Sequence, residues 1–281
     1  MKIITSIKEM QKELDQQRMA GKRIGLVPTM GFLHEGHLSL VREIKKHCNY
    51  IVMSIYVNPT QFSPNEDFSD YPRDFDRDVN LAEQEGCDVI FNPDSEEVYP
   101  KNYLTYVEVE NITKIMCGAS RPIHFRGVTT IVTKLFNIAK PHVAVFGQKD
   151  AQQAIVIKRM AADLNFDVEI IVAPIVREQD SLAMSSRNIY LTPNQREQAL
   201  VLSQSLKAAE RKISAGEKNA AVIIKMIKNK IEEKHDAKID YIEIVDQEKL
   251  ECQTEIKNNV LIALAVKFGK VRLIDNIIVK I

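Results

Sequence analysis

The chain has 281 residues, of which 45% are hydrophobic and 27% charged, and its 38 Lys and Arg residues balance its 38 Asp and Glu residues. This length allows one large domain or two smaller ones with a substantial core. A formal net charge of zero argues against a protein dedicated to nucleic acid, which carries a basic excess to neutralise phosphates. It fits a compact anionic ligand such as a nucleotide, bound at a local basic site.

The cysteines and the N-terminus indicate the compartment. Cys48, Cys87, Cys117 and Cys252 are scattered and form no C-x-x-C pair, so neither a structural zinc site nor a disulfide framework is indicated. The N-terminus is too polar and interrupted for a signal peptide, and no apolar run is long enough to span a bilayer. These features predict reduced thiols and a cytoplasmic protein.

The first two thirds of the chain alternate between short apolar runs and longer amphipathic segments. The predicted strands cover residues 24–28, 51–57, 88–91, 104–109, 142–146 and 168–172, and the predicted helices cover residues 37–47, 74–84, 128–139 and 151–164. Nearly continuous apolar strands separated by helices predict a parallel sheet covered on both faces, which is a doubly wound α/β domain. Such sheets bind ligands beyond the carboxyl ends of the strands, at the topological switch point.

The pattern changes near residue 177. The predicted elements beyond it are helices at 194–215 and 220–234, followed by strands at 239–245, 260–266 and 271–274. We therefore expect a larger domain over residues 1–176 and a smaller α+β domain over residues 177–281. The polar segment 177–188 joins them, and because it includes Leu182 and Met184 we expect a packed loop or lid there.

The strongest local signal runs from Val27 to His37, between the first of these strands and the helix after it. A helix N-terminus attracts phosphate through its unpaired N–H groups and its dipole. Gly31 and Gly36 allow close backbone approach, and His34 and His37 are spaced to share one helix face. Imidazoles there can donate hydrogen bonds to phosphate oxygens. The spacing H-E-G-H excludes the zinc protease motif H-E-x-x-H.

A second candidate turn follows the predicted strand 142–146. Gly147 permits close backbone approach, Lys149 supplies a mobile positive charge, and Asp150 can accept a hydrogen bond from a ribose hydroxyl. Gln153, one helical turn further on, directs a neutral amide towards the same region. A Lys-Asp pair at a strand end is usually a solvated turn, but its predicted position beside the histidine motif favours function.

Two polar segments are further candidates for the site. Ser185, Ser186 and Arg187 supply hydroxyls and a bidentate fork for phosphate oxygens, although in isolation they also fit a serine-rich linker. Asn58 and Gln61 follow a strand and can hold a small hydroxylated or carboxylated substrate, although N-P-T-Q is more often a turn.

The basic segment 121–127 precedes a predicted helix and fits two interpretations equally. It either wraps around an anion or caps the helix. The residues alone do not decide between these.

Together these segments resemble the pantoate–β-alanine ligase (pantothenate synthetase) family. The matching motifs are Pro28-Thr29-Met30-Gly31, His34-x-Gly36-His37, Val57-Asn58-Pro59-x-Gln61-Phe62, His124-Phe125-Arg126-Gly127-Val128, Phe146-Gly147-x-Lys149-Asp150 with Gln152-Gln153, Leu182-Ala183-x-Ser185-Ser186-Arg187-Asn188, and Leu273-Ile274-Asp275-Asn276. They occur in the family's order, and the ordered set is highly specific. One position departs from the pattern, because Ile123 stands where the family commonly has glycine, which puts the conformation of the basic segment in question.

The resemblance implies a Rossmann-like nucleotidyltransferase domain of the His-x-Gly-His superfamily, a smaller C-terminal lid domain and a cytoplasmic homodimer. It implies condensation of pantoate with β-alanine and ATP to give pantothenate, AMP and pyrophosphate, through an enzyme-bound pantoyl adenylate. Mg²⁺ is expected with ATP, held largely by phosphates and water, and no protein ligands are assigned to it. No nucleic acid or membrane partner is expected.

The family pattern also implies roles for individual residues. The ATP-binding residues are Met30, Gly31, His34, Gly36, His37, Gly147, Gln148, Lys149, Asp150, Val176, Met184, Ser185, Ser186 and Arg187. The substrate-binding residues for pantoate and β-alanine are Gln61, Gln153 and Asn58. The family's proton donor corresponds to His37, and we expect His34 and Lys149 to complete the catalytic set.

Two alternatives stay open on the sequence. A different His-x-Gly-His nucleotidyltransferase, such as a cytidylyltransferase or an aminoacyl-tRNA synthetase relative, shares the histidines but is not expected to carry Asn58, Gln61 and Gln153. A non-catalytic nucleotide-binding regulator is free to lose Lys149 or His37, and this chain has both.

Overall fold

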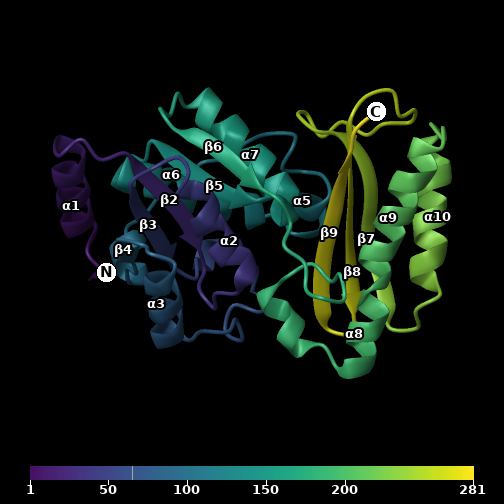
Figure 1. Cartoon of the computed structure of the whole chain (residues 1–281), viewed down its shortest axis with the longest axis horizontal. Coiled ribbons are helices and arrows are strands. Elements are labelled where there is room, and N and C mark those ends of the chain that lie inside the picture. The colour runs from purple at the N-terminus through teal and green to yellow at the C-terminus, as the bar shows by residue number, and fades with distance from the viewer. Residues whose placement is uncertain (65) are drawn as a thin grey trace.

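The computed structural model describes residues 1–64 and 66–281, and its larger sheet has six parallel strands (Figure 1). The strands are β1 (Lys2–Ile4), β2 (Ile24–Thr29), β3 (Tyr50–Ile55), β4 (Val89–Phe91), β5 (Val143–Gly147) and β6 (Glu169–Ala173). Their spatial order is β1-β4-β3-β2-β5-β6. From β2 the chain first builds outward through β3 and β4, and then returns to add β5 and β6 on the other side. The switch point therefore lies between β2 and β5.

Helices cover both faces of this sheet. The first face carries α1 (Ile7–Met19), α6 (His124–Ala139) and α7 (Ala151–Asp163), and the second carries α2 (Glu35–Ile44) and α3 (Phe75–Gln84). Strand residues alternate between the two cores, so that Leu26 of β2 packs on the first side and Val27 on the second. The prediction of a doubly wound, Rossmann-like α/β domain is confirmed.

The smaller sheet is antiparallel and lies in the right half of Figure 1, between the larger sheet and helices α9 (Val201–Ser214) and α10 (Ala220–Glu232). It consists of β7 (Ala237–Asp246), β8 (Val260–Phe268) and β9 (Val271–Val279). One face packs against α9 and α10, and the other packs through Val245 and Leu261 onto Met116 and Ala151 of the larger part. The predicted smaller α+β region is confirmed, and the domain boundary between residues 176 and 177 stays a prediction.

The strand predicted at residues 104–109 is wrong. This segment has no regular secondary structure and pairs with no strand in the described chain. The N–H of Val107 instead donates to Thr130 Oγ1 at 3.0 Å, and its carbonyl accepts from Thr129 Oγ1 at 2.6 Å. Hydroxyl groups on α6 thus satisfy the backbone that a sheet would otherwise have to pair.

Several predicted helix boundaries also differ. The helix predicted at 194–215 is two helices, α8 (Pro193–Ala199) and α9, separated at Leu200. Helix α2 begins two residues earlier than predicted, and α6 begins at His124 rather than Val128. Ile123 directly precedes α6 with a φ of −92°, which an L-residue adopts without the freedom of glycine. The departure from the family pattern at this position therefore causes no backbone strain.

Some elements had no predicted counterpart. They are β1, α1, α4 (Ser95–Val98), α5 (Cys117–Ser120) and the 3₁₀ turns η1 (Pro59–Gln61), η2 (Gln148–Asp150) and η3 (Ser186–Tyr190). The segment after residue 176 is a packed loop as predicted, with Leu182 buried and a bridge pairing Arg177 with Ala183. No helix within residues 1–64 and 66–281 is long and apolar enough to cross a membrane. The four cysteines are free thiols.

Candidate active site

The two predicted phosphate-binding turns follow neighbouring parallel strands. One follows β2 and the other follows β5, and Gly25 of β2 lies opposite Val143 of β5. Both turns line one cleft of about 1380 Å³. That volume exceeds the range of about 300–1,000 Å³ that is typical of single-ligand pockets. The cleft therefore has room for a nucleotide together with small co-substrates.

The cleft contains every predicted site residue except Gly31 and Gln148. It brings together Met30, His34, Gly36, His37, Asn58, Gln61, Gly147, Lys149, Asp150, Gln153, Val176, Met184, Ser185, Ser186 and Arg187. Gly31 lies in the turn behind the cleft with a φ of 83°, a conformation that favours glycine. The side chain of Gln148 donates to Asn276 Oδ1 at 3.3 Å rather than entering the cleft. Residues from five strand ends and loops thus meet at the predicted switch point.

The two histidines form the start of helix α2. His34 is its N-cap, and its Nδ1 accepts a hydrogen bond from the backbone N–H of Gly36 at 3.1 Å. His37 Nδ1 accepts from the backbone N–H of His34 at 3.3 Å. The ring centroids are 4.0 Å apart. Side chains that cap the helix are thereby held together as a pair facing the cleft.

These hydrogen bonds also fix the tautomers. Because Nδ1 of each ring accepts, the proton of each neutral imidazole is on Nε2. Burial, together with the positive charge of Lys149, lowers the pKa of His34 to about 4. Burial and the neighbouring His34 lower the pKa of His37 as well. Both rings are therefore neutral hydrogen-bond donors at pH 7, which suits binding to phosphate oxygens without holding a permanent charge.

The turn that carries Lys149 is held from the second sheet. Asn276 of β9, which is buried, donates through Nδ2 to the carbonyl oxygens of Gln148 at 2.9 Å and of Lys149 at 3.0 Å. The adjacent Asp275 accepts two hydrogen bonds from Arg177, at 2.7 and 2.9 Å. The motif that contains these residues matched the family in the sequence but carried no predicted role. In the structure it joins β9 to the turn after β5.

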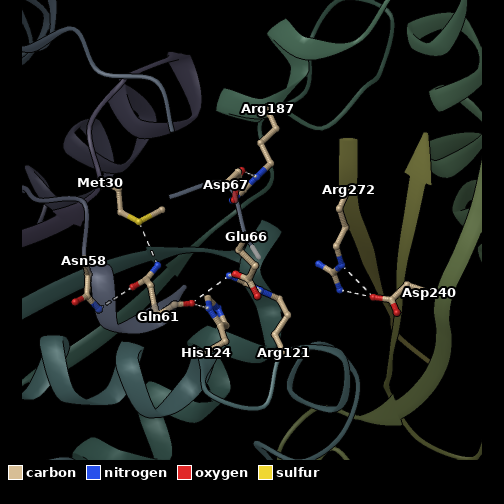
Figure 2. Close-up of polar contacts among 10 residues, drawn as sticks. All are labelled: Met30, Asn58, Gln61, Glu66, Asp67, Arg121, His124, Arg187, Asp240 and Arg272. Atoms are coloured by element: carbon tan, nitrogen blue, oxygen red, sulfur yellow. Dashed lines mark hydrogen bonds and ion pairs between the residues drawn. The ribbon is translucent and has the colours of Figure 1, made fainter. Parts of the chain in front are cut away.

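Asn58 and Gln61 lie at the two ends of the η1 turn that follows β3, and Figure 2 shows their side chains next to each other. The Nδ2 of Asn58 donates to Gln61 Oε1 at 3.1 Å and to the carbonyl of Gly127 at 3.1 Å. Its Oδ1 accepts from Thr60 Oγ1 and the Tyr99 hydroxyl, each at 2.9 Å. Asn58 is thus buried and fully hydrogen-bonded, and it orients Gln61 towards the cleft.

The basic segment 121–127 contributes Arg121 and His124 to the cleft lining, and both also contact the turn that carries Gln61. Arg121 Nη2 donates to the carbonyl of Gln61 at 3.2 Å, and His124 Nδ1 lies 3.1 Å from the same oxygen. A Cβ at Gly127 would lie 2.5 Å from the backbone nitrogen of Gln61, so only glycine allows this approach. The segment therefore fixes the turn that carries Gln61, and Arg121 also pairs with Glu66.

Arg187 is paired with a carboxylate that the sequence reasoning missed. Its Nε donates to Asp67 Oδ2 at 2.7 Å and its Nη2 to Asp67 Oδ1 at 3.0 Å (Figure 2). The guanidinium lies 5.8 Å from the centroid of the Tyr71 ring. Asp67 lies 120 residues away in the chain, and no local pattern indicates the pair. Arg187 is thus held at the cleft by a bidentate ion pair with Asp67.

Part of the cleft wall comes from the second sheet. Lys267, Lys270 and Arg272 line the cleft from the β8–β9 hairpin. Arg272 donates to Asp240 Oδ2 through Nε at 3.0 Å and Nη2 at 2.8 Å (Figure 2). None of these side chains was predicted, because they lie on or between strands whose apolar pattern indicates only the core of the second sheet.

The comparisons with known proteins agree with this geometry. The family model described as Pantoate-beta-alanine ligase matches residues 2–278. The pantothenate synthetase of Acetivibrio thermocellus is 58% identical over 281 residues, covering 100% of both chains. That of Thermoanaerobacter sp. is 55% identical over 276 residues, covering 98% of both. The chain belongs to the pantoate-beta-alanine ligase family.

Solved structures of the family have the same fold. The pantothenate synthetase of Thermus thermophilus superposes with a TM-score of 0.94 at 39% identity, covering 99% of each chain. The pantoate-beta-alanine ligase of Francisella tularensis, complexed with beta-gamma ATP and β-alanine, has a TM-score of 0.79 at 34% identity, covering 99% of this chain and 97% of its own. Family membership removes the alternatives of another nucleotidyltransferase and of a non-catalytic regulator.

Proposed function

We propose that the cleft joins pantoate to β-alanine with ATP, giving pantothenate, AMP and pyrophosphate through a pantoyl adenylate. One observation carries the assignment of residues. The neutral His34–His37 pair and Lys149 lie on adjacent turns at the switch point, in the same cleft as Gln61 and Gln153. The Francisella relative, which is complexed with beta-gamma ATP and β-alanine, supports the same use of the cleft.

In the first step the pantoate carboxylate oxygen bonds to the α-phosphorus of ATP. The bond from that phosphorus to the β-phosphate oxygen breaks, and pyrophosphate leaves with the electron pair. His34 and His37 donate their Nε2–H groups to the phosphate oxygens, and Lys149 with Ser185, Ser186 and Arg187 balances the charge that builds on the leaving group. Because the rings are neutral, they act by hydrogen bonding and need not be protonated beforehand.

Binding residues set the geometry of this step. Gln61 and Gln153 hold pantoate, with Asn58 orienting Gln61 through their 3.1 Å hydrogen bond. The ATP site consists of Met30, Gly31, Gly36, Gly147, Gln148, Asp150, Val176 and Met184 together with the residues that contact the phosphates. Placing the carboxylate in line with the leaving oxygen supplies much of the acceleration.

In the second step the β-alanine amine attacks the acyl carbon of the adenylate, loses a proton and releases AMP. Water would hydrolyse this mixed anhydride, so the cleft must exclude it. We assign that role to a lid domain of residues 177–281, which follows a first domain of residues 1–176. Its β8–β9 hairpin and Arg272 already form one wall of the cleft.

Mg²⁺ would enter with ATP and neutralise its phosphates. Within the described residues no three His, Cys, Asp or Glu side chains form a group able to hold a metal ion. We therefore assign no protein ligands to the ion and expect phosphate oxygens and water to hold it, since Mg²⁺ commonly keeps several waters and binds few carboxylates.

The chain is expected to act as a homodimer in the cytoplasm. The dimer is implied by the family, and light scattering after gel filtration tests it directly. A mass of twice the 32.0 kDa chain is expected, and 32.0 kDa would remove the dimer.

The test of the function supplies ATP and pantoate without β-alanine, and then adds β-alanine. We expect release of pyrophosphate in the first condition, and formation of pantothenate and AMP in the second. Replacing ATP with CTP controls for a general nucleotidyltransferase. Absence of pyrophosphate in both conditions would contradict the assignment.

A further inference from the structure

Asp78 is a buried carboxylate that the reaction described above does not use. It lies on the first turn of α3, and its side chain is almost fully buried, with the residue 1% exposed. Its Oδ2 accepts from the backbone N–H of Phe32 at 2.7 Å, and its Oδ1 accepts from the backbone N–H of Leu33 at 2.7 Å. Bonds from backbone N–H groups to an ionised carboxylate are among the stronger hydrogen bonds in proteins.

The turn that donates these bonds has a strained backbone conformation. Gly31 has a φ of 83° and Phe32 a φ of 49°, so two consecutive residues adopt the left-handed conformation. Glycine adopts it freely, but for an aromatic residue such as Phe32 it is unfavourable. A Cβ at Gly31 would lie 2.9 Å from Asp78 Oδ2, which shows how closely the carboxylate follows the backbone. Asp78 therefore compensates a strained conformation through the N–H groups that this conformation aligns.

The turn leads directly into the catalytic pair. The residue after Leu33 is His34, whose backbone N–H donates to His37 Nδ1. A shift of the turn would therefore move the N-cap of α2 and the ring of His37 together. The carboxylate of Asp78 reaches this point from 46 residues away in the chain, on the helix that covers the same face of the sheet.

We propose that Asp78 is a positioning residue for adenylation: it holds the Gly31–Leu33 turn so that His34 and His37 meet the phosphates of ATP. This inference rests on the proposed function. Asp78 does not line the cleft, and its hydrogen bonds go to the backbone of the turn. Its Oδ1 also lies 3.8 Å from Nη1 of Arg77, the preceding residue of α3.

The test compares Asp78→Asn with Asp246→Asn as a matched control. Asp246 also accepts backbone N–H groups with both oxygens, from Glu248, Lys249 and Glu251, at a turn that includes the left-handed Leu250. That turn lies outside the cleft. Each variant removes one acceptor from a carboxylate that bonds to a turn backbone, although Asp246 is only partly buried. The pair therefore separates an effect on the histidines from the cost of losing such an acceptor.

For Asp78→Asn we expect kcat/KM for ATP in pyrophosphate release to fall about 100-fold, because a shift of roughly 1 Å at a reacting group has that effect. The KM for ATP should rise and kcat should fall, while the KM for β-alanine stays unchanged. Loss of folded protein alone would lower kcat without moving either KM. For Asp246→Asn, kcat/KM should stay within about twofold of the parent.

A second variant, Asp78→Glu, keeps the charge and both acceptors but moves them by one methylene group. It should retain more of the thermal stability than Asp78→Asn and still lose kcat/KM for ATP, which keeps the test decisive if Asp78→Asn does not fold. Parental kcat/KM in Asp78→Glu, or an equal loss in Asp246→Asn, would overturn the inference. Failure of the proposed function is distinct, since the parent protein would then release no pyrophosphate.

Discussion

The turn after β2 and the turn after β5 supply the two halves of the proposed phosphate site, and the protein holds them differently. The histidine turn is fixed from within the first sheet and its helices, by Asp78 of α3 and by the hydrogen bonds of the histidines themselves. The lysine turn is held by Asn276 of β9, in the second sheet. A movement of the second sheet would therefore leave the histidines in place while it carries or releases Lys149.

The two halves of the proposed phosphate site therefore depend on different parts of the fold. The histidine half is held without contacts from the second sheet, whereas the lysine half depends on contact between the two sheets. The largest effects are expected from changes to the histidine half, and smaller ones from the contacts that link it to the rest.

Substitution of His37 should have the largest effect. His37→Ala removes one donor to developing charge, and a loss of about 10²–10³ in the rate of pyrophosphate release is expected. The fold should be retained, because the ring bonds only to the backbone of His34. His47→Ala, beyond the end of α2, is the matched control and should leave the rate unchanged. Turnover at the parental rate in His37→Ala would remove this residue from the mechanism.

The histidines also predict a pH dependence. Since burial lowers the pKa of His34 to about 4, adenylation should be independent of His34 between pH 8 and pH 5, and fall about tenfold between pH 5 and pH 3. The ionised ring cannot accept from the N–H of Gly36. A rate that already falls near pH 6.5 would mean that His34 titrates with an ordinary pKa, and it would contradict the inference that the two histidines are neutral.

The free energy of unfolding should also depend on pH through the titration of His34. The unfolded chain binds a proton at His34 near its ordinary pKa of 6.5, whereas the folded chain binds it only near 4. The free energy of unfolding contributed by this group is therefore fully present above pH 6.5 and is lost as the pH falls from 6.5 towards 4. Chemical denaturation across that range should show a shallower decline in His34→Gln than in the parent protein.

Asn276→Asp tests the lysine half. A carboxylate cannot donate to the carbonyls of Gln148 and Lys149, which lie 2.9 and 3.0 Å from the amide nitrogen. Loss of these bonds should displace Lys149 and raise the KM for ATP about tenfold, since lost hydrogen bonds of this kind are each worth about 1 kcal/mol. The KM for pantoate serves as an internal control and should change little. An equal rise in both constants would indicate a general structural effect.

The sequence predicted the parts of the site whose chemistry is contiguous. The histidine motif and Lys149 each follow an apolar strand, and the strand–turn–helix pattern places both at the switch point. The Ser185–Arg187 segment was recognised because it belongs to the set of motifs that occur in the family's order. The supporting contacts of Asp67, Asp78 and Asn276 join residues 120, 46 and 128 positions apart in sequence. No local pattern contains such contacts, because only the folded chain brings the partners together.

The wrongly predicted strand has a related cause. Of the apolar residues at 104–109, Val107 and Val109 pack against the first core, whereas Leu104 and Tyr106 are exposed. The apolar pattern does not indicate which partner satisfies the backbone. Here the partners are threonine hydroxyls on α6, so the prediction of sheet pairing was wrong.

The smallest effect is expected at the pair that links Arg187 to Asp67. Because both groups are partly exposed, the pair contributes only about 0–1 kcal/mol, and ATP must displace Asp67 to reach the guanidinium. Asp67→Asn should therefore lower the KM for ATP by about twofold to fivefold. Glu66→Gln, which alters the neighbouring pair with Arg121, is the control and should leave the KM for ATP unchanged. A higher KM in Asp67→Asn would mean that Asp67 instead orients Arg187 towards the phosphates.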